Sequence, residues 1–272
     1  MAPLLSIVTV SLENREGLAR TLASVAGQTF TDRELVVVDG GSKDGSVELL
    51  RASGAVVTDW VSEPDAGIYD AQNKGVRRAR GTYCMFLNAG DSLPAADTLA
   101  AFFARAGDED ILYGDVFFEE PDGRRRLERQ PDPLTIPHLF RTTLHHQATI
   151  IRRALFERLG PYDTSFRIMA DYHFFLRAIV VHGASTRHVP VPLAVQVLGG
   201  LSSRPESFAR LREERARARE LALSPILRAF WEEYLAARRG PLLHWLRGVF
   251  RPLARRLRAR SRALRGRPDS PI

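Results

Sequence analysis

The chain has 272 residues and a formal net charge of +7 at pH 7. Its residues are 44% apolar and 26% charged, which is typical of globular proteins and excludes disordered, collagen-like and coiled-coil classes. The length suits one large α/β domain with an appendage, or two small domains. The single cysteine, Cys84, cannot form an intrachain disulfide, which indicates a reducing compartment or indifference to redox conditions.

The positive charge is confined to the last segment of the chain. Residues 238–267 contain eleven arginines and no acidic residue. When these eleven positive charges and the negative charge of Asp269 are excluded, residues 1–237 carry a net charge of −3. A basic balance spread over the whole chain would suggest nucleic-acid binding, but here it belongs to one segment. No stretch reaches the roughly 18 apolar residues of a spanning helix, and residues 1–10 lack the basic start of a signal peptide.

The first part of the chain alternates between short apolar runs and segments with helical spacing. Strands are predicted at 5–11, 34–39, 55–62 and 83–87, and helices at 16–27, 46–52 and 68–79. The run ELVVVD at 34–39 is apolar on both faces, as a buried parallel strand requires. This alternation predicts an α/β fold built on a doubly wound, mostly parallel sheet.

After residue 91 the alternation is looser. The sequence predicts a helix at 98–105, a hairpin of strands 111–118 and 124–128, a loop at 131–137, a strand at 148–151, and helices at 154–159 and 170–181. Further helices are predicted at 207–223 and 225–237. No low-complexity linker separates these parts, so we expect a main domain over 1–206, a helical extension over 207–237 and a basic tail over 238–272.

Polar residues follow the predicted parallel strands where each strand ends. Sheets of this kind bind ligands at the carboxyl ends of their strands, and those ends carry Ser11, Asn14, Asp39, Glu63, Asp65, Asn88 and Asp91. A carboxylate at the end of a central strand is costly without a polar partner, which favours a functional role for Asp39. Ser42 and Asp44 are better interpreted as capping residues for the helix that follows.

Three of these segments allow both a structural and a functional interpretation. Glu63 and Asp65 precede a helix and suit its positive end, but this does not explain the Asn73-Lys74-Gly75 run inside that helix. Asp91 in FLNAGD could end a strand, or hold a hard cation that bridges phosphates, since Mg²⁺ is often held by one or two carboxylates plus substrate. Asp171 in MADYHFFLR could stabilise a helix N-terminus or act as a general base.

Two adjacent histidines, His145 and His146, precede the strand predicted at 148–151. Neighbouring side chains of an extended chain point to opposite sides, so at most one of the two can face a site. A metal centre built from them would need further ligands that the sequence does not identify.

Six segments in order resemble the family 2 glycosyltransferases, which are inverting enzymes of the GT-A fold. They are SIVTVSLENREGLARTLASVAGQT, ELVVVDGGSKDGS, SEPDAGIYDAQNKG, YCMFLNAGD, HHQATI and ADYHFFLR. The resemblance spans residues 5–202 and is greatest to the branch that builds bacterial surface polysaccharides and glycolipids. It implies a Rossmann-like, mostly parallel sheet flanked by helices, with a C-terminal helical extension.

The resemblance also implies site residues for a nucleotide diphosphate sugar. Asp39 matches the contact to the nucleotide base, Ser11 and Asn14 lie in the first nucleotide-binding loop, and Asp65 falls beside the base and ribose. Gln72 stands where the family has an arginine, so the contact to the diphosphate is expected to pass to Lys74.

Further roles are implied for the later motifs. Residues 88–91 match the metal motif, with Asn88 in place of the usual first acid, so Asp91 is the one carboxylate for Mg²⁺ or Mn²⁺. His146 and Gln147 are expected to contact substrate. Asp171 matches the catalytic base, which deprotonates an acceptor hydroxyl in a single displacement that inverts the anomeric centre. Residues 199–202 resemble a loop that closes over the donor.

The basic tail is predicted to form helices at 241–250 and 252–264, each starting with proline. Seven apolar residues fall within an arc of about 100° and five arginines lie opposite, while Arg256 and Arg260 would have to snorkel. This pattern is typical of a helix on an anionic membrane surface. The alternative is a solvated extension whose leucines pack on the main domain. Trp245 and Phe250 lie among aliphatics without forming a stacking platform, so no nucleic-acid partner is expected.

Together these features predict an enzyme attached peripherally to the cytoplasmic face of the cell membrane. It would transfer a sugar from a UDP- or GDP-linked donor to a hydroxyl of a lipid-linked glycan or glycolipid. One alternative is a nucleotidyltransferase, which should carry a glycine-rich, basic phosphate loop that residues 11–17 lack. Another is a non-catalytic, membrane-bound scaffold of the same fold, which Gly90 and Gln72 would favour.

Overall fold

The computed structural model describes residues 2–198 and 205–238. The chain divides into two units, Met1–Leu223 and Ser224–Ile272. The first unit contains the sheet and the helices up to α8 (Phe208–Ala222), and α9 (Pro225–Arg238) is the described part of the second unit. The predicted closing loop at 199–202 and the helices predicted at 241–264 lie outside the described residues. Within the described ranges, no helix is long and apolar enough to cross a membrane.

The first four strands form the parallel half of the sheet, as predicted. They are β1 (Leu5–Ser11), β2 (Arg33–Asp39), β3 (Asp59–Ser62) and β4 (Tyr83–Phe86), in the spatial order β3-β2-β1-β4. The register pairs Ser11 with Asp39 and Asp39 with Ser62. The polar residues at these strand ends are therefore neighbours at one edge of the sheet.

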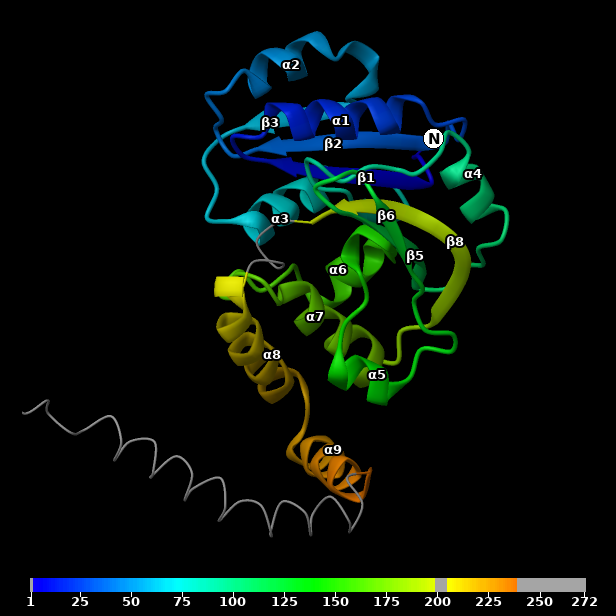
Figure 1. Cartoon of the computed structure of the whole chain (residues 1–272), viewed down its shortest axis with the longest axis vertical. Helices are drawn as coiled ribbons and strands as arrows, with labels where there is room; N and C mark the ends of the chain where they lie inside the picture. The colour runs from blue at the N-terminus through cyan, green and yellow to red at the C-terminus, as the bar shows by residue number, and fades with distance from the viewer. Residues whose placement is uncertain (1, 199–204, 239–272) are drawn as a thin grey trace, which may run out of the picture. The chain divides into compact units, whose positions relative to one another are not determined.

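The rest of the sheet is mixed (Figure 1). β7 (Thr149–Arg152) runs antiparallel to β4 and to β5 (Ile111–Glu119). β5 also pairs with β6 (Arg125–Glu128) in an antiparallel hairpin and with β8 (Thr186–Val197) in parallel. The chain thus forms an α/β fold in which one half of the sheet is parallel and the other half is mixed.

Helices cover both faces of the parallel half. α1 (Arg15–Ala26) and α2 (Ser46–Ala52) lie on one face, and α3 (Ile68–Arg78) and α6 (Arg153–Leu159) on the other (Figure 1). α3 approaches the sheet closely at Gly75, where an added Cβ would lie 2.3 Å from Cγ1 of Val8. Only glycine fits there, so this contact fixes how the start of α3 lies over the carboxyl ends of the strands.

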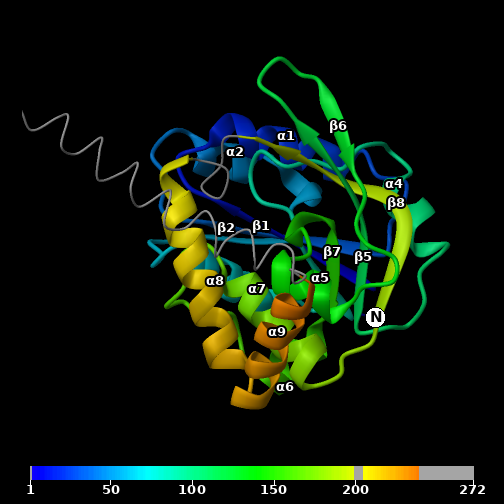
Figure 2. The ribbon, with the colours of Figure 1, turned by 60° about the horizontal axis from the view of Figure 1, so that its bottom comes forward.

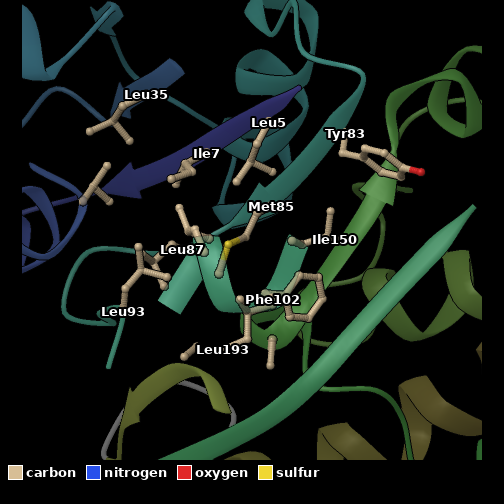
Figure 3. Packing of buried hydrophobic residues seen from close by; sticks show 14 of the residues in the cluster. Leu5, Ile7, Leu35, Tyr83, Met85, Leu87, Leu93, Phe102, Ile150 and Leu193 are labelled. Atoms are coloured by element: carbon tan, nitrogen blue, oxygen red, sulfur yellow. The ribbon is translucent and has the colours of Figure 1, made fainter. Parts of the chain in front are cut away.

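An apolar core connects the two halves of the sheet (Figure 3). Leu5, Ile7 and Met85 from the parallel strands pack in one cluster with Ile150 of β7, and Phe102 of α4 (Thr98–Phe103) belongs to the same cluster. All five side chains are fully buried. Burying a side chain of this size contributes about 1.5–3 kcal/mol, so the core holds the strand ends in fixed positions.

Four sequence predictions were wrong in detail. β8 was not predicted, because its two prolines suggest a break; its only described partner strand is β5, and an edge position tolerates proline. α5 (Ile136–Arg141) overlaps the end of the predicted loop at 131–137. The strand predicted at 55–62 begins at Asp59, after a 3₁₀ turn at Gly54–Val56. The helix predicted at 170–181 is α7 (Ala170–Phe175) followed by a π-helical turn, Leu176–Val181.

Candidate active site

The loop after β2 is organised by Asp39, which is completely buried. Its Oδ2 accepts hydrogen bonds from the backbone N–H groups of Gly41 (3.1 Å) and Ser42 (2.9 Å) and from the Ser62 hydroxyl (2.6 Å). Its Oδ1 accepts the Ser42 hydroxyl at 2.5 Å. These four bonds compensate the cost of burying the carboxylate at a strand end. The nucleotide contact predicted for Asp39 stays a prediction, beside this role in shaping the turn.

Neither residue predicted to cap α2 is its N-cap, which is Gly45; Asp44 lies just before the helix and holds its first residue, and Ser42 is used elsewhere. Asp44 Oδ1 accepts the backbone N–H and the hydroxyl of Ser46 (3.0 and 2.7 Å), and its Oδ2 accepts the backbone N–H of Arg15 at 2.7 Å. The Ser42 hydroxyl lies 2.8 Å from the backbone nitrogen of Glu13 and accepts its N–H. Asp44 and Ser42 thus tie the loop after β2 to the loop after β1.

The loop after β1 brings Ser11 and Asn14 to the edge of the sheet. The Ser11 side chain is buried and its hydroxyl has no hydrogen-bond partner among the described residues, which is uncommon for a buried polar atom. Glu13 adopts a left-handed backbone conformation with φ +47°, a feature that clusters at functional sites. Asn14 caps α1 by accepting the Gly17 N–H at 3.1 Å, and it donates to the Ala89 carbonyl at 3.0 Å. Asn14 therefore joins this loop to the 88–91 segment.

Asp65 lies directly against Gly40. An added Cβ on Gly40 would lie 2.7 Å from Oδ2 of Asp65 and 3.0 Å from Cδ1 of Leu12. The other carboxylate oxygen accepts the Gly67 N–H at 2.8 Å. The Leu12 side chain is 58% exposed at this edge. A flat ring could pack against the Gly40 backbone and the exposed Leu12 side chain, and the Asp65 carboxylate could accept hydrogen bonds from donors on that ring.

Lys74 is paired within the loop that precedes α3. Its Nζ donates to the Pro64 carbonyl at 2.8 Å and lies 2.9 Å from Oε1 of Glu63 and 3.7 Å from Oδ2 of Asp70. The hydrogen bond to Glu63 raises the pKa of Lys74. A contact between Lys74 and a diphosphate stays a prediction, and making it would require Lys74 to exchange one of these partners.

A chain of polar side chains connects α3 to Asp171. Gln72 Nε2 donates to Oδ1 of Asn88 at 3.1 Å, and the Asn88 amide nitrogen lies 3.1 Å from Nε2 of His146. Nδ1 of His146 lies 3.3 Å from Oδ2 of Asp171. The two histidines diverge as the sequence predicted, because His145 packs edge-on against Phe118 with ring centroids 5.2 Å apart. His146 is thus the histidine that faces the site.

Asp171 occupies the first turn of α7 and is 7% exposed. Its Oδ1 accepts the backbone N–H of Tyr172 at 2.8 Å and lies 3.1 Å from the Tyr69 hydroxyl. That hydroxyl is also 2.6 Å from the Ile168 carbonyl, to which it can donate. Since Tyr69 has one proton, it can donate to the carboxylate, or donate to Ile168 and accept from the protonated acid. Both protonation states of Asp171 therefore have a partner.

The loop before α7 is held by Glu214 of α8, which the sequence did not suggest as a functional residue. The two helices lie side by side (Figure 2). The Glu214 carboxylate is 7% exposed and accepts the backbone N–H groups of Arg167 (3.1 and 3.2 Å), Ile168 (2.9 Å) and Met169 (3.1 Å). Donors at a helix start need such an acceptor, so α8 completes the N-terminus on which Asp171 sits.

Asp91 is the carboxylate of the 88–91 segment and is 8% exposed. Burial raises the pKa of Asp91 to about 6, although nearby His146, the Val197 N–H and the Gln147 side chain act in the opposite direction. Gln147 therefore lies close enough to Asp91 to favour its charged form. A divalent cation beside this buried carboxylate would favour the charged form further.

Comparison with known proteins identifies the family. Residues 6–170 match the family described as Glycosyl transferase family 2. The chain belongs to glycosyltransferase family 2. It is 37% identical over 209 residues to a PGL/p-HBAD biosynthesis glycosyltransferase of Mycobacterium tuberculosis, covering 74% of this chain and 80% of that protein. An uncharacterized glycosyltransferase of the same species is 36% identical over 186 residues, 66% of this chain and 70% of the relative.

Solved structures show that this glycosyltransferase has the GT-A fold. Residues 1–349 of S. aureus TarS in complex with UDP-GlcNAc superpose with a TM-score of 0.62 at 18% identity, covering 80% of this chain and 66% of that fragment. The match covers 39% of the longer TarS chain, so this chain spans well under two thirds of that protein. The mannosyltransferase PcManGT from Pyrobaculum calidifontis, in complex with GDP-Man and Mn²⁺, superposes with a TM-score of 0.57 at 17% identity. The match covers 90% of this chain and 83% of PcManGT.

The donor set of the glycosyltransferase fits a cation that is shared with a substrate. Among residues 2–198 and 205–238, no group of three His, Cys, Asp or Glu side chains could hold a metal ion. In the described 88–91 segment Asp91 is the one carboxylate, and it is buried, so the remaining ligands of a cation there would have to be phosphate oxygens and water. The residues present therefore fit a Mg²⁺ or Mn²⁺ ion that binds with the diphosphate.

Three residues that build the site were not predicted as site residues: Tyr69, Gln72 and Glu214. Tyr69 and Gln72 are three apart on α3, and both are buried. Polar residues at helical spacing on one face were a usable signal, since a buried helix face is normally apolar. Glu214 carried no signal, because it is one of many charged residues in α8.

Proposed function

We propose that this glycosyltransferase transfers a sugar from a nucleoside diphosphate to an acceptor hydroxyl with inversion, using Asp171 as the general base. One observation carries the proposal. Asp171 is a buried carboxylate with one oxygen held by Tyr172 and Tyr69 and the other facing His146, on a helix whose start is fixed by Glu214. A single positioned carboxylate suits a single displacement, because one base must remove one proton as the new bond forms.

The nucleotide is proposed to bind at the carboxyl ends of β1 and β2. The unpartnered Ser11 hydroxyl, the Asp65 carboxylate beside Gly40 and the exposed Leu12 side chain support this assignment. The TarS and PcManGT structures are complexes with UDP-GlcNAc and GDP-Man, so UDP- and GDP-sugars are the first donors to test. Asn14, whose side chain bonds Ala89, would keep the nucleotide loop and the 88–91 segment in register.

Asp91 is proposed to hold Mg²⁺ or Mn²⁺ together with the donor diphosphate. A bound divalent cation supplies positive charge that favours departure of the nucleoside diphosphate. The nearby Gln147 side chain favours the charged form of Asp91, and Asn88 is held by Gln72 at the same segment. These contacts prepare one protein ligand and leave the other positions to substrate oxygens.

The acceptor is proposed to be a glycolipid or lipid-linked glycan at an anionic membrane surface. A relative that is 37% identical carries a name that places it in PGL/p-HBAD biosynthesis, and residues 238–267 carry eleven arginines and no acid. We expect that removing residues 239–272 releases the protein from vesicles containing anionic lipid and preserves transfer to a detergent-soluble acceptor. Co-sedimentation with vesicles measures this; binding that persists after truncation would exclude the tail as the anchor.

A donor screen tests the activity. The purified full-length chain is titrated with UDP- and GDP-sugars in the presence of Mn²⁺, and release of UDP or GDP is measured with and without a panel of alkyl and aryl glycosides. Proton NMR of the product then gives its anomeric configuration. Binding without transfer to any acceptor hydroxyl or to water would favour the non-catalytic scaffold, and a retained anomer would contradict the single displacement.

A further inference from the structure

His146 lies between two parts of the site: the donor side, which contains the 88–91 segment, and the base side, which contains Asp171. Its side chain is 23% exposed and belongs to a short 3₁₀ turn, His146–Ala148, that precedes β7. One ring nitrogen, Nε2, lies 3.1 Å from the Asn88 amide nitrogen on the donor side. The other, Nδ1, lies 3.3 Å from Oδ2 of Asp171 on the base side. The imidazole therefore spans from the 88–91 segment to the base.

The position of the imidazole proton follows from its neighbours. The Asn88 amide oxygen accepts a hydrogen bond from Gln72, so the NH₂ group of Asn88 faces His146. An NH₂ group can only donate, which makes Nε2 of His146 the acceptor. In a neutral imidazole one nitrogen accepts and the other carries the proton. Nδ1 of His146 thus carries the proton, on the side of the ring where Oδ2 of Asp171 lies 3.3 Å away.

We infer that His146 is a positioning residue for Asp171, an assignment that rests on the proposed role of Asp171 as the base. Oδ1 of Asp171 is engaged by Tyr172 and Tyr69. The His146 ring nitrogen that lies 3.3 Å from Oδ2 limits the rotation of the carboxylate by its close approach and leaves a lone pair of Oδ2 for an acceptor hydroxyl. The series Gln72, Asn88, His146 sets which tautomer forms, so the donor side of the site determines the orientation of the base.

This role differs from the substrate contact that the sequence predicts for His146. A residue that contacts the donor affects its binding, whereas a residue that orients the base affects the chemical step. Substitution of His146 by Asn or Gln tests the two ring nitrogens one at a time. The Asn amide reaches the position of Nδ1, and the Gln amide reaches the position of Nε2. His146→Asn retains a donor towards Asp171, and His146→Gln retains a partner for Asn88.

The kinetic experiment compares His146→Asn, His146→Gln and His146→Ala in the full-length chain. The readout is release of UDP or GDP from the nucleotide sugar that the donor screen identifies. We expect kcat to fall roughly 10- to 100-fold in the Gln and Ala variants, the usual cost of losing a residue that orients a functional group. We expect His146→Asn to stay within about fivefold of the unchanged protein, and the donor KM to stay within about threefold in all three. A raised donor KM at unchanged kcat, or equal losses for Asn and Ala, would overturn the inference.

A second readout does not depend on turnover. In protein labelled with ¹⁵N-histidine, the imidazole nitrogen shifts of His146 are expected to report the Nδ1–H tautomer, and Asn88→Ala is expected to release it to a mixture. An Nε2–H tautomer in the unchanged protein would overturn the inference even if a variant misfolds. Asp171→Asn distinguishes the two proposals. Full transfer by that variant would contradict the role of Asp171 as the general base. An inactive Asp171→Asn together with a fully active His146→Ala would contradict only the positioning role of His146.

Discussion

The nucleotide side and the base side of the site are built in different ways. On the proposed nucleotide side, acidic groups bond residues nearby in the sequence, such as Asp39 with Ser42 and Asp44 with Ser46, and the contact of Asp44 with Arg15 spans 29 positions. On the proposed base side, apart from the adjacent Tyr172, the partners are farther apart along the chain, since Tyr69 is 102 positions from Asp171. Local turns therefore contribute more to the nucleotide side, and tertiary packing more to the base side.

This difference predicts that substitutions on the two sides affect different steps. Changes at the base side should lower the rate of transfer and leave nucleotide binding intact, because none of its residues belongs to the loops after β1 and β2. Changes at the nucleotide side should weaken binding and leave the chemical step intact. The polar series through Asn88 and His146 is the place where the two sides meet.

The largest effect is expected for Asp171→Asn. The amide cannot take a proton from the acceptor, so we expect transfer to fall by about 10²- to 10⁴-fold, the usual contribution of a general base. The dissociation constant for UDP or GDP, measured by calorimetry, should stay near that of the unchanged protein. Loss of nucleotide binding in this variant would show that Asp171 belongs to the nucleotide side, and the distinction between the sides would fail.

How much the sequence could predict follows the same division. The strands β1, β2 and β4 depend on residues close together in the chain, and their patterns were interpreted correctly. The tertiary partners of Asp171 have no local pattern: Glu214 is one of three acids in α8, and nothing around it marks the one that is buried. β8 was missed because Pro190 and Pro192 are tolerated only through its position in the sheet.

The next largest effect is expected for Glu214→Ala. It leaves three backbone N–H groups at the start of α7 without their acceptor, at a cost of about 3 kcal/mol. In a domain of this size that lowers Tm by roughly 6 to 12 °C, and kcat should fall more than nucleotide affinity does. Glu214→Gln keeps one accepting oxygen and should lose less.

The matched control is Glu213→Ala, because Glu213 is the exposed neighbour on the same helix. Thermal unfolding followed by circular dichroism and the rate of nucleotide release measure the two effects. If Glu213→Ala and Glu214→Ala behave alike, the effect belongs to α8 as a whole, and the hydrogen bonds from the turn before α7 to Glu214 are not its cause.

A smaller, pH-dependent effect is expected at Asp91. Burial raises the pKa of this carboxyl to about 6 from a usual value of 3.8. Between about pH 3.8 and pH 6 the Asp91 carboxyl is therefore protonated in the folded protein and ionised in the unfolded chain. The contribution of Asp91 to the free energy of unfolding decreases as the pH rises through this range. A cation binds only the ionised form, so its affinity should fall up to tenfold per unit as the pH drops below about 6.

Calorimetric titration of Mn²⁺ into the protein with its nucleotide sugar at about pH 5, 6 and 7.5 measures this dependence, since a nucleotide sugar has no ionisation of its own in this range. Asp91→Asn should bind the cation weakly at every pH and lose the slope. A slope that survives in Asp91→Asn would assign the titration to another group and remove Asp91 as the metal ligand.

The smallest effect is expected for Gly40→Ala on the nucleotide side. The added Cβ would lie 2.7 Å from Oδ2 of Asp65 and 3.0 Å from Cδ1 of Leu12, closer than carbon contacts allow, so both side chains must move. The far end of a side chain moves at modest cost, and we expect nucleotide affinity to fall roughly fivefold, about 1 kcal/mol. The rate of transfer at saturating donor should not change, because Asp171 and its partners lie on other elements.

Gly27→Ala is the control for Gly40→Ala, since its nearest neighbour would be the Ala23 carbonyl at an ordinary 3.5 Å. It lies at the end of α1, away from both sides of the site, and should alter neither binding nor rate. A fall in kcat for Gly40→Ala at unchanged affinity would mean that the loop after β2 acts on the chemical step. The two sides would then be coupled through the loops as well as through His146, and the separation drawn from their contacts would be incomplete.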